Sequence, residues 1–203
     1  MVIVVTGPAY SGRLTMANAI VSHVDGAISV PVVTTQRNEA DEHLPYTTVD
    51  RETFESMRDE GRLIAITTFG EHLYGFDKDA LVPRAGQIPV VISDARSAYK
   101  LGEYLTAEGV QGICVYMHCS VRTMLFRRAT LCRVYSDDDL AVVHDVYGDH
   151  SIQYSRLHRL SDSGKGFIKV IPVNSDTMAS RSYPEKFIKP LIGQLLNTAR
   201  LER

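Results

Sequence analysis

Short apolar runs rich in β-branched residues alternate along this chain with segments that have the apolar spacing of helices. The runs predict strands over residues 2–6, 28–33, 46–49, 63–67, 88–93, 110–117 and 167–173. The segments between them predict helices over residues 15–24, 51–60, 95–108, 121–128 and 184–201. Within the second run, Pro31 favours an edge strand or a bend. This alternation is typical of an α/β domain whose central sheet is mostly parallel.

Two stretches interrupt the alternation. Residues 34–86 contain short strands and turns, and residues 129–166 are polar with a helical pattern. We expect both to be excursions from the core. Because ligands of a parallel sheet bind outside the carboxyl ends of its strands, the loops that follow the predicted strands are the first places to look for a site.

The composition excludes several classes of protein. Of the 203 residues 44% are apolar and 23% are charged, and the 22 Lys and Arg nearly balance the 24 Asp and Glu. These proportions are those of a globular domain rather than of a disordered chain, a collagen or a coiled coil. No apolar run approaches the roughly 18 residues of a membrane span, and duplex-binding proteins are usually more basic. We therefore expect neither a membrane nor a nucleic acid as partner.

Other signals concern the cellular location and metals. The first residues carry no basic leader, and the odd count of three cysteines (Cys114, Cys119 and Cys132) favours reduced thiols. We expect a cytoplasmic protein. A metal site built from Cys114, His118 and Cys119 is disfavoured because neighbouring side chains on a strand face opposite ways. We expect no metal held by protein side chains.

The loop between the first predicted strand and helix reads Gly7-Pro-Ala-Tyr-Ser-Gly12-Arg13-Leu14-Thr15. In the phosphate loop G-x-x-x-x-G-K-[ST], successive backbone N–H groups surround phosphate oxygens at a helix N-terminus. Both glycines stand at that spacing, but Arg13 replaces the lysine and Leu14 replaces the residue that binds Mg2+. Arg13 keeps a positive charge, whereas Leu14 offers no oxygen. We expect phosphate binding without intact magnesium ligation; the alternative is a glycine turn that binds nothing.

Further segments stand in the order and spacing of one family's motifs. Besides the loop, they are residues 34–37 (T-T-R), 46–54 (Y-x-F-V-S-x-E-x-F), 61–64 (G-x-F-L), 72–75 (N-x-Y-G), 90–98 (L-L-D-I-D-x-Q-G-A) and 170–176 (a late strand with Asn and Asp). No single motif is decisive, but they are collinear apart from a short deletion between Gln36 and Tyr46. On this collinearity the chain resembles the guanylate kinase family.

The resemblance implies a three-part architecture with a P-loop NTPase-type core. The core takes residues 1–33, 87–128 and 167–203, a strand-rich insert (34–86) binds a nucleoside monophosphate, and a helical lid (129–166) closes over ATP. The implied reaction transfers the γ-phosphoryl group of ATP to a monophosphate, typically GMP. The implied cofactors are ATP and Mg2+, the latter held mainly through the nucleotide phosphates.

The resemblance also implies roles for individual residues. ATP and its phosphates are bound by Gly7, Ser11, Gly12, Arg13, Leu14, Thr15 and Asn174. The monophosphate is bound by Thr34, Arg37, Tyr46, Thr68, Tyr74 and Asp94. Catalytic roles fall to Arg13, Asp94, Arg128 and Arg133.

Several positions depart from the family's pattern and leave alternatives open. Thr68 stands where the family has the glutamate that reads guanine, Gln36 replaces an arginine, and His144 replaces a lid arginine. The base could therefore differ from guanine. A second hypothesis is a catalytically silent relative that binds a phosphorylated ligand or a protein partner. A third is a phosphotransferase with another small phosphate acceptor.

Overall fold

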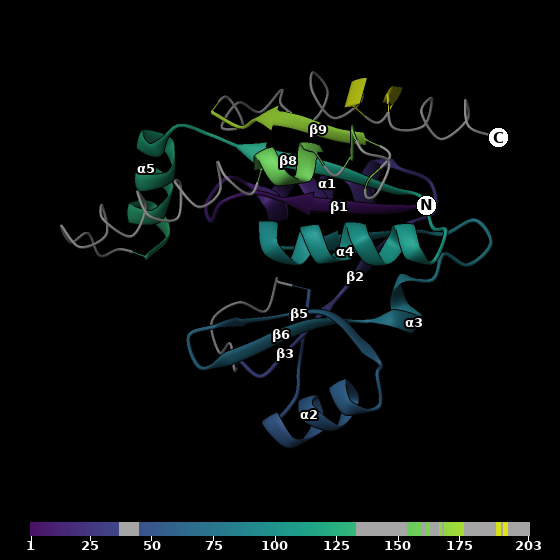
Figure 1. Ribbon diagram of the computed structural model, residues 1–203. Helices are drawn as coiled ribbons and strands as arrows, with labels where there is room; N and C mark the ends of the chain where they lie inside the picture. The colour runs from purple at the N-terminus through teal and green to yellow at the C-terminus, as the bar shows by residue number, and fades with distance from the viewer. Residues whose placement is uncertain are drawn as a thin grey trace.

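The computed structural model describes residues 1–36, 45–132, 154–159, 161–162, 167, 169–176, 190–191 and 193–194. Two sheets organise this part of the chain, one in the upper and one in the lower half of Figure 1. The upper sheet and its helices form the core; the lower sheet belongs to the insert.

The core sheet has five parallel strands in the order β2-β7-β1-β8-β9. The strands are β1 (Val2–Thr6), β2 (Ala27–Val30), β7 (Ile88–Ile92), β8 (Gly112–His118) and β9 (Lys169–Asn174). Every residue of β1 is buried, as expected for a central strand covered on both faces. The predicted parallel α/β core is therefore confirmed.

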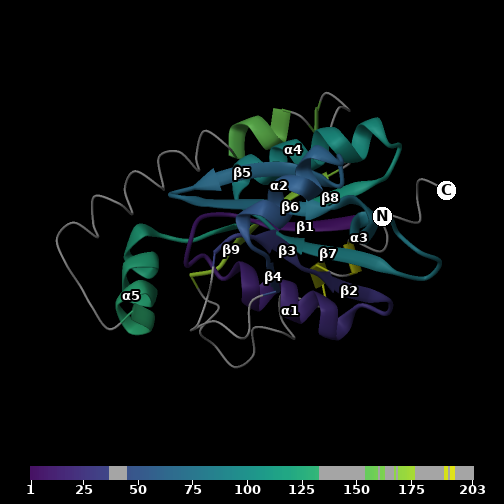
Figure 2. The same ribbon diagram turned by 90° about the horizontal axis from the view of Figure 1, so that it is seen from below.

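Helices cover both faces of this sheet. Helix α1 (Arg13–His23) packs with Met16 and Ile20 against one face, and α4 (Ala95–Ala107) packs with Ala98 and Leu101 against the other. Figure 2 shows the two helices on opposite sides of the strands. The side chains of β1 alternate between the two faces, since Ile3 and Val5 contact the α1 side and Val4 the α4 side.

The insert is built around a four-stranded sheet in the order β4-β3-β6-β5. Its elements are β3 (Val32–Thr34), β4 (Tyr46–Thr48), α2 (Arg51–Asp59), β5 (Leu63–Phe69), β6 (His72–Asp77) and α3 (Lys78–Leu81). Strand β3 pairs parallel with β4 and antiparallel with β6, which also pairs antiparallel with β5. The small core of the insert forms where Phe54 of α2 meets Val33 and Leu63.

Pro31 separates the two sheets. The single strand predicted over residues 28–33 is two strands, because β2 lies at the edge of the core sheet and β3 belongs to the insert sheet. Proline has no N–H to donate to a ladder, so the chain can leave one sheet here and enter the other. The predicted bend at Pro31 is confirmed.

The remaining described residues complete the core. Helix α5 (Val121–Cys132) follows β8, and residues 154–159 form a short helical segment whose Leu157 is buried on the α4 side of the sheet. The tyrosine rings of Tyr116 and Tyr154 contact each other there, tilted by 43° with centroids 4.5 Å apart. Most of the helical stretch predicted over 129–166 and of the helix predicted over 184–201 lies outside the described residues. Among the described residues, no helix is long and apolar enough to span a membrane.

Candidate phosphate-binding site

The loop between β1 and α1 has a backbone that glycine makes possible. Gly7 and Gly12 adopt φ angles of 144° and 90°. A Cβ on Gly7 would lie 2.2 Å from the carbonyl oxygen of Met117, so the loop is pressed against the carboxyl end of β8. Gly12 caps α1 without a side-chain hydrogen bond. The N–H groups of the first turn of α1 therefore have no intrahelical acceptor and are available to an anion.

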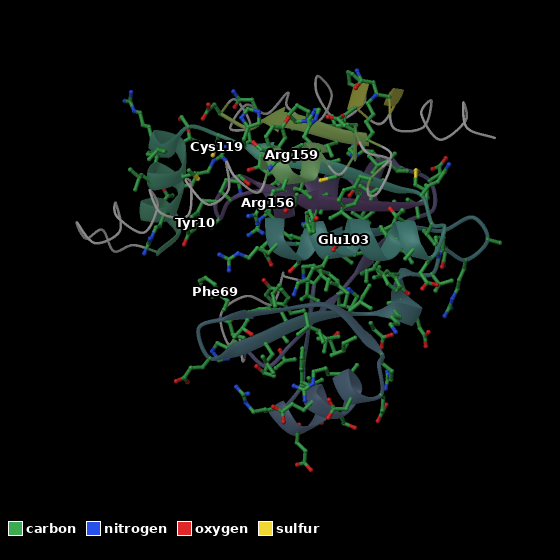
Figure 3. The ribbon with its side chains drawn as sticks, viewed as in Figure 1. Tyr10, Phe69, Glu103, Cys119, Arg156 and Arg159 are labelled. Carbon is green, nitrogen blue, oxygen red and sulfur yellow. The ribbon has the colours of Figure 1, made fainter. Side chains whose placement is uncertain are left out.

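The side chain of Tyr10 packs against residues near α5. Its backbone has a positive φ of 61°. The ring packs with Cys119 and Met124 at the start of α5. Figure 3 shows Tyr10 and Cys119 on the side of the molecule where α5 stands. Burial raises the pKa of the Cys119 thiol, which a hydrogen bond with Ser175 and the charge of Arg127 only partly oppose, so Cys119 serves this cluster as an apolar residue.

Arg127 of α5 connects the loop to the rest of the core by hydrogen bonds. The sequence did not predict this role. Its Nη1 donates to the carbonyl oxygen of Tyr10 and to Oγ of Ser175, each at 3.0 Å. Its Nη2 donates to the carbonyl oxygen of Ser175 at the end of β9. One guanidinium thus joins the loop, α5 and the last core strand.

Three buried hydroxyl groups surround the loop without a hydrogen-bond partner among the described residues: Thr6 Oγ1, Ser11 Oγ and Ser93 Oγ. Thr6 ends β1 and Ser93 follows β7, and the N–H of Ser93 donates to the carbonyl oxygen of Val5 at 3.0 Å. They therefore gather at the carboxyl edge of the parallel sheet. Because buried polar groups are nearly always paired with protein groups or water, these hydroxyls mark a place where a polar ligand or a bound water can complete the network.

Arg13 points from the loop toward the end of β7. Its Nη1 donates to the carbonyl oxygen of Ser93 at 2.7 Å. Removal of the guanidinium from water lowers the pKa of Arg13, while the nearby Asp94 and Tyr46 act in the opposite direction. The side chain therefore reaches the border between core and insert. The predicted roles of Arg13 in ATP binding and catalysis stay predictions.

Asp94 begins α4 and binds its first turn. Oδ1 accepts from the N–H groups of Arg96 and Ser97 at 2.7 and 2.9 Å, and Oδ2 accepts from Oγ of Ser97 at 2.6 Å. Oγ of Ser97 also lies 3.1 Å from Oγ1 of Thr67 on β5. Asp94 thus caps a core helix and, through Ser97, connects to the insert.

We expect replacement of Asp94 by alanine to cost about 0.5–2 kcal/mol of stability, because α4 loses its N-cap. Asp94→Asn keeps an oxygen acceptor and should lose less. Urea unfolding of both variants measures this. The variant for comparison is Asp50→Ala, which removes an N-cap of the same kind from α2, where Oδ1 of Asp50 accepts from the N–H of Thr53 at 2.7 Å. An Asp94→Ala protein as stable as the wild type would contradict the capping role.

The insert presents phenols and a buried hydroxyl to the same border. The hydroxyl of Tyr74 donates to Oε1 of Gln36, and the N–H of Gln36 donates to Oγ1 of the buried Thr34 at 3.1 Å. Burial raises the pKa of Tyr74, as does the neighbouring Tyr46, against a hydrogen bond with Thr34. Tyr46 and Tyr74 both pack against the α4-side core cluster. Thr34, Tyr46 and Tyr74 therefore stand together, as the resemblance implies.

The other predicted site residues differ in burial, and some of them lie outside the described residues. Thr68 is exposed and pairs with Leu73, whereas its neighbour Thr67 pairs with Tyr74 and reaches Ser97. Leu14 is half-buried and Thr15 exposed, and Arg128 is half-buried on α5. Arg37, Arg133 and His144 lie outside the described residues. The roles predicted for these residues stay predictions.

The end of β9 forms a turn that binds the start of α5. Oδ1 of the exposed Asn174 accepts from the N–H of Asp176 at 2.9 Å. Oδ1 of Asp176 accepts from the N–H and Oγ of Ser120, both at 2.9 Å. Hydrogen bonds from Thr123 and Ser120 lower the pKa of Asp176. Asn174, which the resemblance assigns to ATP binding, thus lies next to Ser175, to which Arg127 donates hydrogen bonds.

The residues around the loop do not fit a protein-held magnesium ion. Leu14 has no oxygen to offer, and both oxygens of Asp94 accept hydrogen bonds within α4. In the described part of the chain no three His, Cys, Asp or Glu side chains come together as metal ligands do. Mg2+ prefers oxygen ligands, carboxylates among them, and keeps several waters, and the loop from Gly7 to Thr15 contains no carboxylate.

Comparison with known proteins shows the fold. No family model matches the sequence, and no curated protein matches it. Among solved structures, the guanylate kinase from Anaplasma phagocytophilum is similar with a TM-score of 0.59 and 19% sequence identity. The match covers 100% of this chain and 85% of that one. The chain therefore has a guanylate-kinase-like α/β fold with a mostly parallel central sheet.

Proposed function

We propose that the protein binds the phosphates of ATP at the loop from Gly7 to Thr15 and transfers the γ-phosphoryl group to a nucleoside monophosphate. The observation that supports this most is the group of unpaired buried hydroxyls of Thr6, Ser11 and Ser93 around the loop. A second support is the start of α1, whose N–H groups and helix dipole favour a phosphate.

The acceptor, in this proposal, is a ribo- or deoxyribonucleoside monophosphate, GMP or one with another base. A phosphate oxygen of the acceptor forms a bond to the γ-phosphorus, and the bond from that phosphorus to the β-bridging oxygen breaks, leaving ADP. Such transfer depends on positioning and on neutralisation of charge more than on covalent chemistry. Tyr46, Tyr74 and Thr34 orient the acceptor from the insert, and the loop amides orient the donor. Any Mg2+ comes with the nucleotide.

A catalytically silent protein that binds a phosphorylated ligand is the second candidate. Three observations favour it: Leu14 in place of a magnesium ligand, the bond from Arg13 to the carbonyl oxygen of Ser93, and the use of Asp94 as a helix cap. Loss of a key electrostatic donor commonly lowers a rate by about 10²–10³. Such a protein would keep phosphate binding and lose transfer.

A coupled assay of ADP formation separates the two candidates. ATP with Mg2+ is supplied together with GMP, dGMP, AMP, CMP, UMP or TMP in turn, and calorimetry measures binding of the same nucleotides. The kinase proposal expects turnover with at least one acceptor, above the hydrolysis seen without acceptor. Binding without turnover for every acceptor would establish the silent protein instead. If the protein neither binds nor converts any of these nucleotides, nucleotides are not its ligands.

A further inference from the structure

Arg13 is directed at the border between the core and the insert. Among the described residues, its side chain donates a hydrogen bond to the carbonyl oxygen of Ser93, the residue that follows β7. A guanidinium has five N–H donors in a rigid fork. The fork thus has donors to spare where β7 ends and α4 begins.

The insert meets the core at this place. Thr67 of β5 contacts Ser97 of α4 through their hydroxyls, and Nζ of Lys100 on α4 donates to the carbonyl oxygen of Ile66. Tyr46 and Tyr74 of the insert pack against the cluster that contains Ala95 and Ala98 of the same helix. Arg13 therefore lies near Tyr46 of the insert, and Tyr46 in turn neighbours Tyr74.

The charge of Arg13 is incompletely balanced by its surroundings. Asp94 lies close, but its two oxygens accept from Arg96 and Ser97 within α4. Desolvation of Arg13 outweighs the attraction of Asp94 in its effect on the pKa. Arg13 is thus a partly buried cation whose hydrogen-bond acceptor, the carbonyl oxygen of Ser93, is neutral, and whose neighbouring carboxylate, Asp94, also binds other groups. Such a cation favours the binding of a further anion.

The insert itself offers no cation at this point in its described residues. Gln36 stands where the resemblance implies an arginine for the monophosphate, and its amide oxygen accepts from Tyr74. A phosphate monoester carries a charge of about −1.5 to −2 at neutral pH. Hydroxyl groups alone neutralise none of that charge, so an acceptor held by Tyr46 and Tyr74 needs a positive partner. The predicted Arg37 lies outside the described residues, and Arg13 is a cation that the described residues place near Tyr46.

We propose that Arg13 supplies this partner and binds the phosphate of the acceptor monophosphate, together with Tyr46 and Tyr74, rather than the polyphosphate of ATP. This inference rests on the proposed function, since it assigns the ligand of one residue within it. The fork of Arg13 keeps one donor on Ser93 and turns others toward the acceptor. The phosphate loop thereby supplies a cation at a place where Gln36 of the insert carries no charge.

Calorimetry on Arg13 variants tests the assignment. The probes are the monophosphate among GMP, AMP, CMP, UMP and TMP that binds the wild type most tightly, its nucleoside, and the non-hydrolysable analogue AMP-PNP. Arg13→Gln keeps a donor for Ser93 and removes the charge; Arg13→Lys keeps the charge. The matched control is Arg84→Gln, at an exposed arginine between α3 and β7. Thermal unfolding checks that each variant folds.

We expect Arg13→Gln to weaken monophosphate binding by about 10- to 100-fold, the loss of a charged hydrogen bond. The affinity of Arg13→Gln for the nucleoside and for AMP-PNP should stay within about twofold of the wild type. Arg13→Lys should bind the monophosphate with an affinity between those of the wild type and Arg13→Gln, and Arg84→Gln should bind all three ligands like the wild type. Weakened AMP-PNP binding with unchanged monophosphate binding would overturn the inference, as would an equal loss for nucleoside and monophosphate or a wild type that binds no monophosphate. Charge-dependent monophosphate binding without transfer in the coupled assay would support it and remove only the kinase.

Discussion

Replacement of Gly7 by alanine should destabilise the protein by about 2–5 kcal/mol, through backbone strain and overpacking together. The added methyl group would lie 2.2 Å from the carbonyl oxygen of Met117 and 3.0 Å from Oγ of Ser11, on a backbone with a φ of +144°. Neither the β8 carbonyl nor the loop backbone can move aside without breaking the sheet. In a chain of this size such a loss lowers the melting temperature by about 5–20 °C.

Gly86→Ala is the matched control for this variant. Gly86 also has a positive φ, of +77°, but nothing lies within 4 Å of the position of its Cβ. Only the cost of the left-handed backbone applies there, about 1 kcal/mol. Thermal unfolding of the two variants side by side isolates the close approach of the loop to β8. Equal melting temperatures for both would contradict the contact between Gly7 and Met117.

Replacement of Arg127 by methionine should also have a large effect, about 2–4 kcal/mol of stability and a marked loss of AMP-PNP binding. Methionine keeps the length and the apolar packing of the side chain and removes the bonds to Tyr10 and Ser175. Hydrogen bonds to a charged group contribute about 1.5–3 kcal/mol each, and their loss leaves acceptors without a partner. The loop then loses its connection to α5 and β9.

The control for Arg127 lies on the same helix. Arg122 is exposed one and a half turns earlier on α5, and Arg122→Met should change stability and AMP-PNP affinity little. Urea unfolding and calorimetry on both variants provide the comparison. An Arg127→Met protein that matches Arg122→Met in both measurements would show that the loop keeps its shape without the guanidinium.

The core could be predicted from sequence because its signal is local. Strands such as the fully buried β1 and β7, whose middle residues are buried, are short apolar runs, and helices such as α4 follow with an Asp cap at residue 94. The bend at Pro31 could be predicted for the same reason, since one residue decides it. Strand β6 was missed: Gly75 interrupts its side-chain pattern, and its place is fixed by pairing with β3 and β5.

The site could be predicted only in part because its geometry depends on distant contacts. Arg127 lies 117 residues from Tyr10 and 48 from Ser175, and no local pattern distinguishes it from Arg128. The choice between Thr67 and Thr68 depends on an irregularity in β5, where the register shifts between Ile64 and Thr67. A shift of one residue moves each side chain to the other face of a strand. The direction of Arg13 likewise follows from the acceptor that the end of β7 presents.

A crystal structure with AMP-PNP tests the central claim most directly. The account predicts phosphate density inside the loop between Gly7 and Thr15, with oxygens within hydrogen-bond distance of the first N–H groups of α1. The hydroxyl of Ser11, which has no partner among the described residues, should contact the nucleotide or a water bound to it. Saturating AMP-PNP bound elsewhere, with the loop empty, would contradict the claim that this loop binds phosphate.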